Sequence, residues 1–257
     1  RRVLQLEHFY HEQRRRLNLL VDGDGKPEGG RWNYDRENRR RLASAPHPPA
    51  SPSFAPDEVT REVIELVQRL LPGLPGRIDS FSWPVTREQS LQAVRSFIAE
   101  RLPSFGDFQD AMWAEEPLLY HSLLSPSLNL KLLRPIDVVQ PAVDAYRAGL
   151  APLNAVEGFI RQVVGWREYL RGVYWNSGQS YGRRNALEHN GHLPWFYWSG
   201  ETDMRCMRDV IGTVLRHGYA HHITRLMVSG NFALIVGVQP RQVADWYLGM
   251  YADGVDW

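Results

Sequence analysis

The 257-residue sequence has little that would cross-link it covalently or place it in a membrane. It contains one cysteine, so it cannot form an internal disulfide, which suits a reducing compartment. No apolar run approaches the roughly 20 residues that a membrane helix needs, and no charged and then apolar leader opens the chain. We therefore expect a soluble, cytoplasmic protein that does not enter a membrane.

The sequence also lacks a strong net charge. A formal charge of +1 gives no general attraction to phosphate, so any contact with nucleic acid must use a local basic face. Arginines gather in three places: residues 14–16, residues 31–41 and residues 183–184. Solvated helix faces and turns would explain any one of these clusters as well as DNA contact does.

Neither end of the sequence resembles a natural terminus. Residue 1 is Arg rather than Met, and residues 251–257 carry no tail. We expect a piece of a longer protein. With 43% apolar residues, it is still long enough to bury a sizeable core, either as one large domain or as a domain with an appendage.

Apolar residues recur at helical spacing, whereas the two-residue alternation of strands is nearly missing. The helical stripes fall within residues 63–71, 156–164 and 207–215. A helix over the first 20 residues should end in the Gly- and Asp-rich turn at 22–30, which resembles part of a calcium loop but lacks its downstream ligands. Five prolines in residues 42–56 predict an extended connector. The pattern predicts an all-α fold, with a helix, loop and connector over 1–56 and a helical domain over 57–257.

Residues 120–129 (YHSLLSPSLN) are rich in small hydroxyl side chains at a point where a helix could begin. Hydroxyls and free backbone N–H groups at a helix start can bind phosphate. Ordinary N-capping by Ser125 or Ser127 would explain the same pattern.

Residues 159–171 (FIRQVVGWREYLR) place Gln162, Trp166 and Arg167 on one side of a predicted helix, with Glu168 turned toward the next face. A planar aromatic ring beside amide and guanidinium groups could hold a flavin ring or a nucleobase. Burial of Trp166 in a helical core is the structural alternative.

His221 and His222 are followed closely by Arg225. Neighbouring residues on a helix point about 100° apart, so the two imidazoles cannot both face one small metal ion. Histidine exchanges protons near neutral pH, which suits acid–base chemistry. Nine tryptophans and eleven tyrosines supply oxidisable rings, although many of them must serve packing alone.

Together with residues 195–206 (WFYWSGETDMRC), these segments resemble the photolyase/cryptochrome family and look most like its bacterial iron–sulfur (6-4) photolyases. The resemblance implies the helical FAD-binding domain of that fold, without its N-terminal α/β antenna domain. The residues that it implies for FAD binding are Ser122, Leu124, Ser125, Ser127, Asn129, Gln162, Trp166, Arg167, Arg225, Asp253 and Asp256.

The resemblance also assigns roles outside the flavin pocket. His222 would donate a proton to the lesion, and His221 would help to position it. Trp246 and Trp198, with Tyr247 nearby, would carry electrons to the flavin. The connector region, with Arg36, Arg39, Arg40 and Arg41, would approach DNA.

By the same resemblance, Cys206 is the first ligand of a [4Fe–4S] cluster, which needs four thiolates. The other three ligands lie beyond residue 257 in the family, so this chain cannot hold the cluster unaided. The family residues that approach flavin N5 also lie beyond it, so we expect incomplete FAD binding by this piece.

The implied function is light-driven repair of (6-4) pyrimidine photoproducts in damaged DNA by a monomeric enzyme. One alternative is a cryptochrome-like photoreceptor that keeps the flavin and signals through a partner. The other is a helical nucleic-acid binder that uses the arginine clusters and has lost its cofactor.

Overall fold

The computed structural model describes residues 5–178 and 180–255, and within these residues the fold is helical with no sheet. The described residues contain two isolated β-bridges, Val21 to Pro27 and Gly191 to Val238. The all-α prediction is confirmed. The α-helices are α1 (Leu6–Arg16), α2 (Glu58–Leu70), α3 (Arg87–Ser96), α4 (Leu102–Phe108), α5 (Ser125–Asn129), α6 (Pro135–Arg147), α7 (Leu153–Ile160), α8 (Glu168–Ser177), α9 (Phe196–Ser199), α10 (Arg205–His217), α11 (Asn231–Ile235) and α12 (Pro240–Met250).

Three segments are π-helical: η3 (Phe97–Arg101), η4 (Arg161–Arg167) and η6 (Thr224–Gly230). Short 3₁₀ turns lie at η1 (Glu28–Gly30), η2 (Asp35–Glu37) and η5 (Tyr181–Arg183). No helix in the described part of the chain is long and apolar enough to span a membrane.

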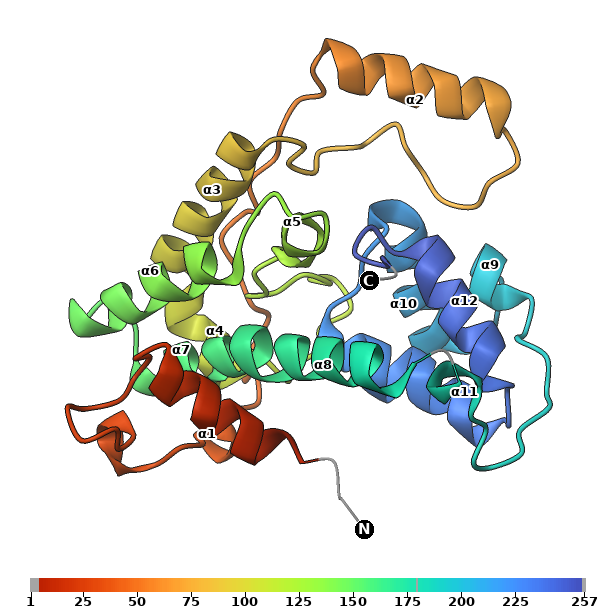
Figure 1. Cartoon of the computed structure of the whole chain (residues 1–257). Helices are drawn as coiled ribbons and strands as arrows, with labels where there is room; N and C mark the ends of the chain where they lie inside the picture. The colour runs from red at the N-terminus through yellow and green to blue at the C-terminus, as the bar shows by residue number, and fades with distance from the viewer. Residues whose placement is uncertain (1–4, 179, 256–257) are drawn as a thin grey trace.

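The core consists of two hydrophobic clusters. The first joins α3, α4, α6 and α7, and its centre is the aromatic group Phe97, Phe105 and Phe159. The second joins α9 to α12 around Trp246, which is completely buried. The apolar stripes predicted in what are now α7 and α10 face these clusters. Figure 1 shows α8 running across the molecule between the parts that hold the two clusters.

The N-terminal segment packs on the helical body. Tyr10 of α1 donates a hydrogen bond to the buried carboxylate of Glu157 in α7, 3.0 Å away. Arg14 is fully buried and donates to the carbonyl oxygens of Leu19 and Leu20. These contacts fasten α1 to the helices that follow. The division of the chain at residue 56 stays a prediction.

The connector is extended, as the prolines predicted, with no helix between Asn38 and Asp57. Asp57 then caps α2 by accepting a hydrogen bond from the backbone N–H of Thr60. None of the residues of α2 is buried, and Figure 1 shows this helix standing apart from the body. The chain returns to the body through residues 77–84 and enters α3 with a capping box between Thr86 and Gln89.

Candidate functional site

A partly buried ion pair between Arg225 and Asp253 is joined by two residues of α5 that are far away in the sequence. Arg225 binds both carboxylate oxygens of Asp253, at 3.0 and 2.9 Å. Ser125, the first residue of α5, donates to the same carboxylate at 2.6 Å, and Asn129 donates to the backbone oxygen of Asp253 at 2.8 Å. Four predicted flavin-binding residues therefore converge on one point. The helix start expected near Ser125 is confirmed, but the Ser125 hydroxyl contacts Asp253 instead of capping the helix.

Aromatic rings enclose the Arg225 guanidinium. Its central carbon lies 4.2 Å from the ring centre of Tyr251 and 4.9 Å from that of Tyr219. Burial opposes the positive charge, but Asp253 and the tyrosines favour it, and the pKa of Arg225 is raised overall. Burial also raises the pKa of Tyr219 to about 12. The centre holds a fixed cation and a fixed carboxylate that are both partly shielded from solvent.

The two adjacent histidines have different environments. His221 is 1% exposed and stacks on His121, with ring centres 4.4 Å apart and planes 10° apart. Burial, with His222 and Arg225 nearby, lowers the pKa of His221 to about 4. Burial lowers the pKa of His121 well below its usual value, and the neighbouring positive groups add to the effect. Both stacked rings are therefore neutral at neutral pH.

His222 reaches the surface instead. Partial burial of its ring lowers its pKa; the nearby Asp110 carboxyl works against this shift, while Arg225 adds to it. Burial and the negative charge of Asp35 raise the pKa of Asp110. An exposed imidazole beside a carboxyl group can exchange protons with a ligand that approaches from the surface.

The structure does not gather Gln162, Trp166 and Arg167 on one face. Trp166 is 45% exposed and lines a cavity of about 370 Å³ with Tyr10 and Trp32. Arg167 points elsewhere, donating to the carbonyl oxygen of Leu128 at 3.3 Å and pairing with Glu168. Gln162 is partly buried. The predicted face assumed 3.6 residues per turn, whereas residues 161–167 form a π-helical turn, which changes the direction of successive side chains.

The remaining residues of the predicted serine-rich segment have separate environments. Ser127 is buried and accepts a hydrogen bond from Ser90 at 3.1 Å. Leu124 belongs to the first hydrophobic cluster. Ser122 lines a cavity at the connector. Asp256 lies outside the described residues.

A row of aromatic rings runs from the Arg225 centre into the second cluster. Trp246 lies 5.5 Å from Tyr251, 5.1 Å from Tyr247 and 5.0 Å from Tyr197, measured between ring centres. Its indole N–H donates to the carbonyl oxygen of Tyr197, the residue before Trp198. Of the three residues predicted for electron transfer, Trp246 and Tyr247 are therefore in ring contact, and Trp198 follows Tyr197 in the chain. Nothing in the residues around Tyr197 predicted its contact with Trp246.

The four connector arginines are exposed, but two of them have acidic partners. Arg39 pairs with Asp35, and Arg40 pairs with Asp107 at 2.8 Å. Arg36 and Arg41 form no ion pair with any described residue. The positive charges of Arg36 and Arg41 are therefore not neutralised by a neighbouring carboxylate, unlike those of Arg39 and Arg40.

Cys206 is an exposed free thiol in the first turn of α10. Within residues 5–178 and 180–255, no group of three or more His, Cys, Asp or Glu side chains could hold a metal ion. A [4Fe–4S] cluster needs four ligands, so the residues of this chain do not fit it by themselves.

These helices and the Arg225 centre they carry define the class of the protein as the helical domain of the photolyase fold. The structure of a bacterial class III photolyase from Agrobacterium tumefaciens matches it with a TM-score of 0.56 and 19% sequence identity, over 67% of this chain and 36% of that one. The family described as deoxyribodipyrimidine photo-lyase-related protein matches residues 1–83.

A (6-4) photolyase of Agrobacterium fabrum is 49% identical to the chain over all 257 residues. The chain belongs to the photolyase/cryptochrome family. It spans about half the length of that relative, 50%, as expected of a piece of a longer protein. An uncharacterized protein of Acanthamoeba polyphaga mimivirus is 30% identical over 112 residues, which are 43% of this chain and 85% of the viral protein.

Proposed function

We propose that this chain is the helical domain of a light-driven DNA photolyase that repairs (6-4) pyrimidine photoproducts. The observation that carries the proposal is its 49% identity, over its whole length, to a protein named a (6-4) photolyase. The convergence of Ser125, Asn129, Arg225 and Asp253 supports it, because the family resemblance implies a flavin-binding role for all four residues.

The side chains around this centre fit a flavin dinucleotide. Within the described part of the chain, His121 Nε2, His221 Nδ1, Arg167 Nε and the Tyr251 hydroxyl are buried and have no hydrogen-bond partner. Native proteins normally satisfy such groups, and a bound cofactor or water can do so. FAD carries both acceptors and donors for them. Bound in its reduced form, it would supply the photoexcited electron that initiates repair.

The proposed roles of the chain are to hold the cofactor, place the lesion and move a proton. Arg225, fixed by Asp253, would offer a positive charge to the flavin, and Ser125 and Asn129 would hold the carboxylate in place. Ser122, Leu124, Ser127, Gln162, Trp166, Arg167 and Asp256 stay proposed contacts of the same cofactor.

His222 is proposed as the proton donor to a lesion flipped out of the DNA stack. Its exposed ring and its neighbour Asp110 suit this role. His221 would help to position the lesion, because its buried ring is held in place by the stack on His121. Trp246, Trp198 and Tyr247 would return the cofactor to its reduced form.

Damaged DNA is the proposed partner, and its phosphates would be held in part by Arg36, Arg39, Arg40 and Arg41. We further propose that Cys206 is one of four cluster ligands, the other three coming from the rest of the protein. The monomeric state and the cytoplasmic location stay predictions.

Replacing His222 with Ala in the full-length protein tests the proposal. Blue-light repair of a (6-4) lesion should be lost, while the flavin absorbance of the purified protein stays unchanged. His8→Ala is the matched control, because His8 is exposed on α1, to which no part of the site belongs, and this variant should repair normally. Unchanged repair by His222→Ala would remove the assignment.

A further inference from the structure

His121 is a buried histidine to which the proposed function gives no role. It lies in the segment before α5, and its ring stacks face to face on His221, with ring centres 4.4 Å apart and planes 10° apart. His222, the next residue along the chain, reaches the surface beside Asp110. The two adjacent histidines therefore differ in what touches their rings: an imidazole covers one, and a carboxyl group lies near the other.

Hydrogen bonds hold the backbone on both sides of this stack. The carbonyl oxygen of His121 accepts a hydrogen bond from the buried guanidinium of Arg101 at 3.1 Å. The carbonyl oxygen of His221 accepts from the Thr224 hydroxyl at 2.9 Å and from the backbone N–H of Arg225 at 3.1 Å. The two segments are thus fixed where the rings meet, although they lie 100 positions apart in the sequence.

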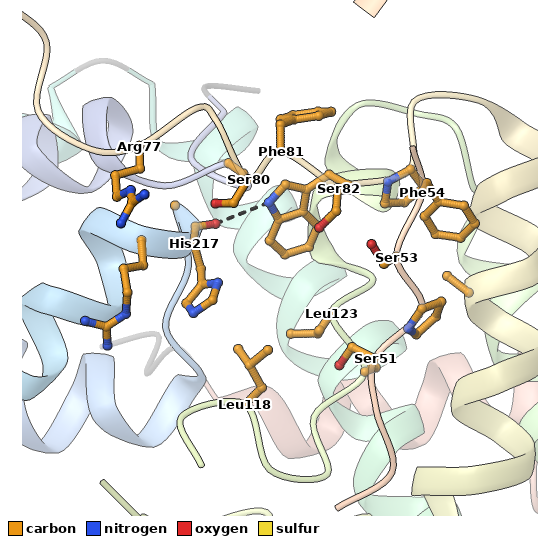
Figure 2. A pocket seen from close by; sticks show the side chains of 18 of the residues that line it. Ser51, Ser53, Phe54, Arg77, Ser80, Phe81, Ser82, Leu118, Leu123 and His217 are labelled. Atoms are coloured by element: carbon orange, nitrogen blue, oxygen red, sulfur yellow. Dashed lines mark hydrogen bonds between the residues drawn. The ribbon is translucent and has the colours of Figure 1, made fainter. Parts of the chain in front are cut away.

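The stack is also closed to the nearest cavity. A cavity of about 330 Å³ lies beside the His121 segment, between the connector and the helical body (Figure 2). Its lining includes Leu118, Ser122 and Leu123 from this segment, but neither His121 nor His221. The two histidines are only 8% and 1% exposed. Water in the cavity is therefore kept away from the stacked rings.

The charges around the stack oppose a proton on either ring. The groups that act on the His121 ring besides its partner are Arg101 from η3, Arg225 from η6 and His222, and the last two also act on His221. None of these groups is acidic. A buried imidazolium without a counter-charge is costly, because its desolvation is not compensated. His222 differs, since the Asp110 carboxyl favours its protonated form.

We propose that His121 is a positioning residue that separates the roles of the two histidines: by covering the ring of His221 it keeps that ring neutral and leaves proton donation to His222. The imidazolium of His222 would pass its proton to the lesion and become neutral, while His221 stays neutral throughout. The lesion is the destination of the proton only under the proposed function, on which this part of the inference rests. The neutral state of His221 does not depend on it.

Nuclear magnetic resonance of the full-length, flavin-bound protein with ¹³C-labelled histidine rings tests this separation. The wild-type signal of His221, identified by its loss in His221→Gln, should not titrate as the pH falls from about 8 to about 6. His121→Asp places a carboxylate against the ring, so His221 should then titrate near or above about pH 6.5. Ordinary titration of His221 in wild type, or no titration in a folded His121→Asp, overturns the proposal.

His11→Asp is the matched control for this substitution. His11 is also a stacked histidine, with its ring centre 4.3 Å from that of Trp32, but it lies on α1 and takes no part in the stack of His121 on His221. The same change at this position should leave the His221 signal as it is in wild type. A His221 signal that responds equally to both changes overturns the proposal, because contact with His121 would then not matter.

A second pair of variants keeps the test decisive if His121→Asp does not fold, which circular dichroism would reveal. His121→Phe keeps a flat ring on His221, so His221 should stay neutral and the dependence of repair on pH should be that of wild type. His121→Ala uncovers one face of the ring, so His221 should titrate at least about one pH unit higher than in wild type. Equal titration of His221 in His121→Phe and His121→Ala overturns the proposal.

Failure of the proposed function would give a different result. If His221 titrates as expected in all variants and the protein removes no lesion in light, the proposed function fails and the role of His121 in keeping His221 neutral is supported. If the protein repairs lesions but its His221 titrates as an ordinary histidine, this inference alone is overturned.

Discussion

His121 and His221 stack in the interior with no carboxylate facing them. The charged and titratable groups around the pair are Arg101, Arg225 and His222, and the edge of Phe105 completes the enclosure. Arg101, Arg225 and His222 all oppose protonation of the stacked imidazoles. The stack is therefore a neutral element in a positively charged region, and it fixes the backbone from which His222 projects.

The stack should make the stability of the protein depend on pH. The pKa of His221 is about 4 in the folded chain and about 6.5 when unfolded, so between these values only the unfolded chain takes up the proton. This stabilising contribution is complete above about pH 6.5 and falls by about 1.4 kcal/mol per pH unit toward pH 4. Urea unfolding across this range should show the fall, and His221→Asn should reduce its slope. An unchanged slope in the variant would contradict the account.

The ionisation of His222 should govern how repair depends on pH. Its pKa lies below the usual 6.5, so the protonated donor becomes more abundant as the pH falls from 8 toward 6. The repair yield per absorbed photon should rise over this interval in the full-length protein. Asp110→Asn removes a neighbour that favours the charged ring, so its rise should shift to lower pH. A yield that falls on acidification would exclude protonated His222 as the donor.

Single-residue roles were only partly predictable. Arg225 and Asp253 follow from the family pattern, and the structure brings them together. His121 gave no signal, because its stacking partner lies 100 positions away and nothing in the neighbouring residues indicates that contact. Tyr197 and Arg101 were missed for the same reason: their significance depends on long-range packing.

Among the elements, α4 and α7 pack closely because α4 carries Gly106. A Cβ atom added there would lie 2.5 Å from the Cα atom of Ala155 in α7. The two helices therefore meet backbone to backbone, and they support the first hydrophobic cluster beneath the His121 segment.

Gly106→Ala should destabilise the chain by about 1–3 kcal/mol, because the added methyl group forces the two backbones apart. Gly172→Ala in α8 is the control, since open space surrounds that position, and it should be neutral or stabilising by about 0.5–1 kcal/mol. Chemical unfolding of both variants measures the difference. Equal stability of Gly106→Ala and wild type would show that the helices do not pack this closely.

The existence of helices was predictable from apolar periodicity, but their local form was not. Residues 156–164 carry the predicted stripe, yet Trp166 lines a surface cavity while Arg167 donates to the carbonyl oxygen of Leu128. Residues 161–167 also form a π-helical turn that packs against α1 and α6, and the apolar spacing of the sequence does not predict such a turn. The faces predicted for this segment therefore differed from those found.

At the scale of the whole molecule, the all-α architecture and the extended connector were readable from composition and spacing. The exposed apolar side of α2 was not, because a helical stripe normally indicates burial. The chain spans about half of its (6-4) photolyase relative, so surfaces exposed here need not be exposed in the longer protein.

DNA affinity should depend unequally on the connector arginines. Arg36 and Arg41 form no ion pair within the described residues, whereas Arg39 and Arg40 are paired with Asp35 and Asp107. Replacing Arg36 and Arg41 together with Ala should weaken DNA binding more than the same change at Arg39 and Arg40, and should reduce the dependence on salt. Fluorescence anisotropy with a lesion-containing duplex at several salt concentrations measures both effects. The reverse order would place the DNA elsewhere.

The most direct test of the central claim is the light-dependent loss of (6-4) lesions from a defined oligonucleotide, with the purified full-length protein and a dark control. The account predicts a protein with flavin absorbance that removes the lesion only under blue light. Flavin photoreduction without any loss of the lesion would contradict it and favour a cryptochrome-like photoreceptor.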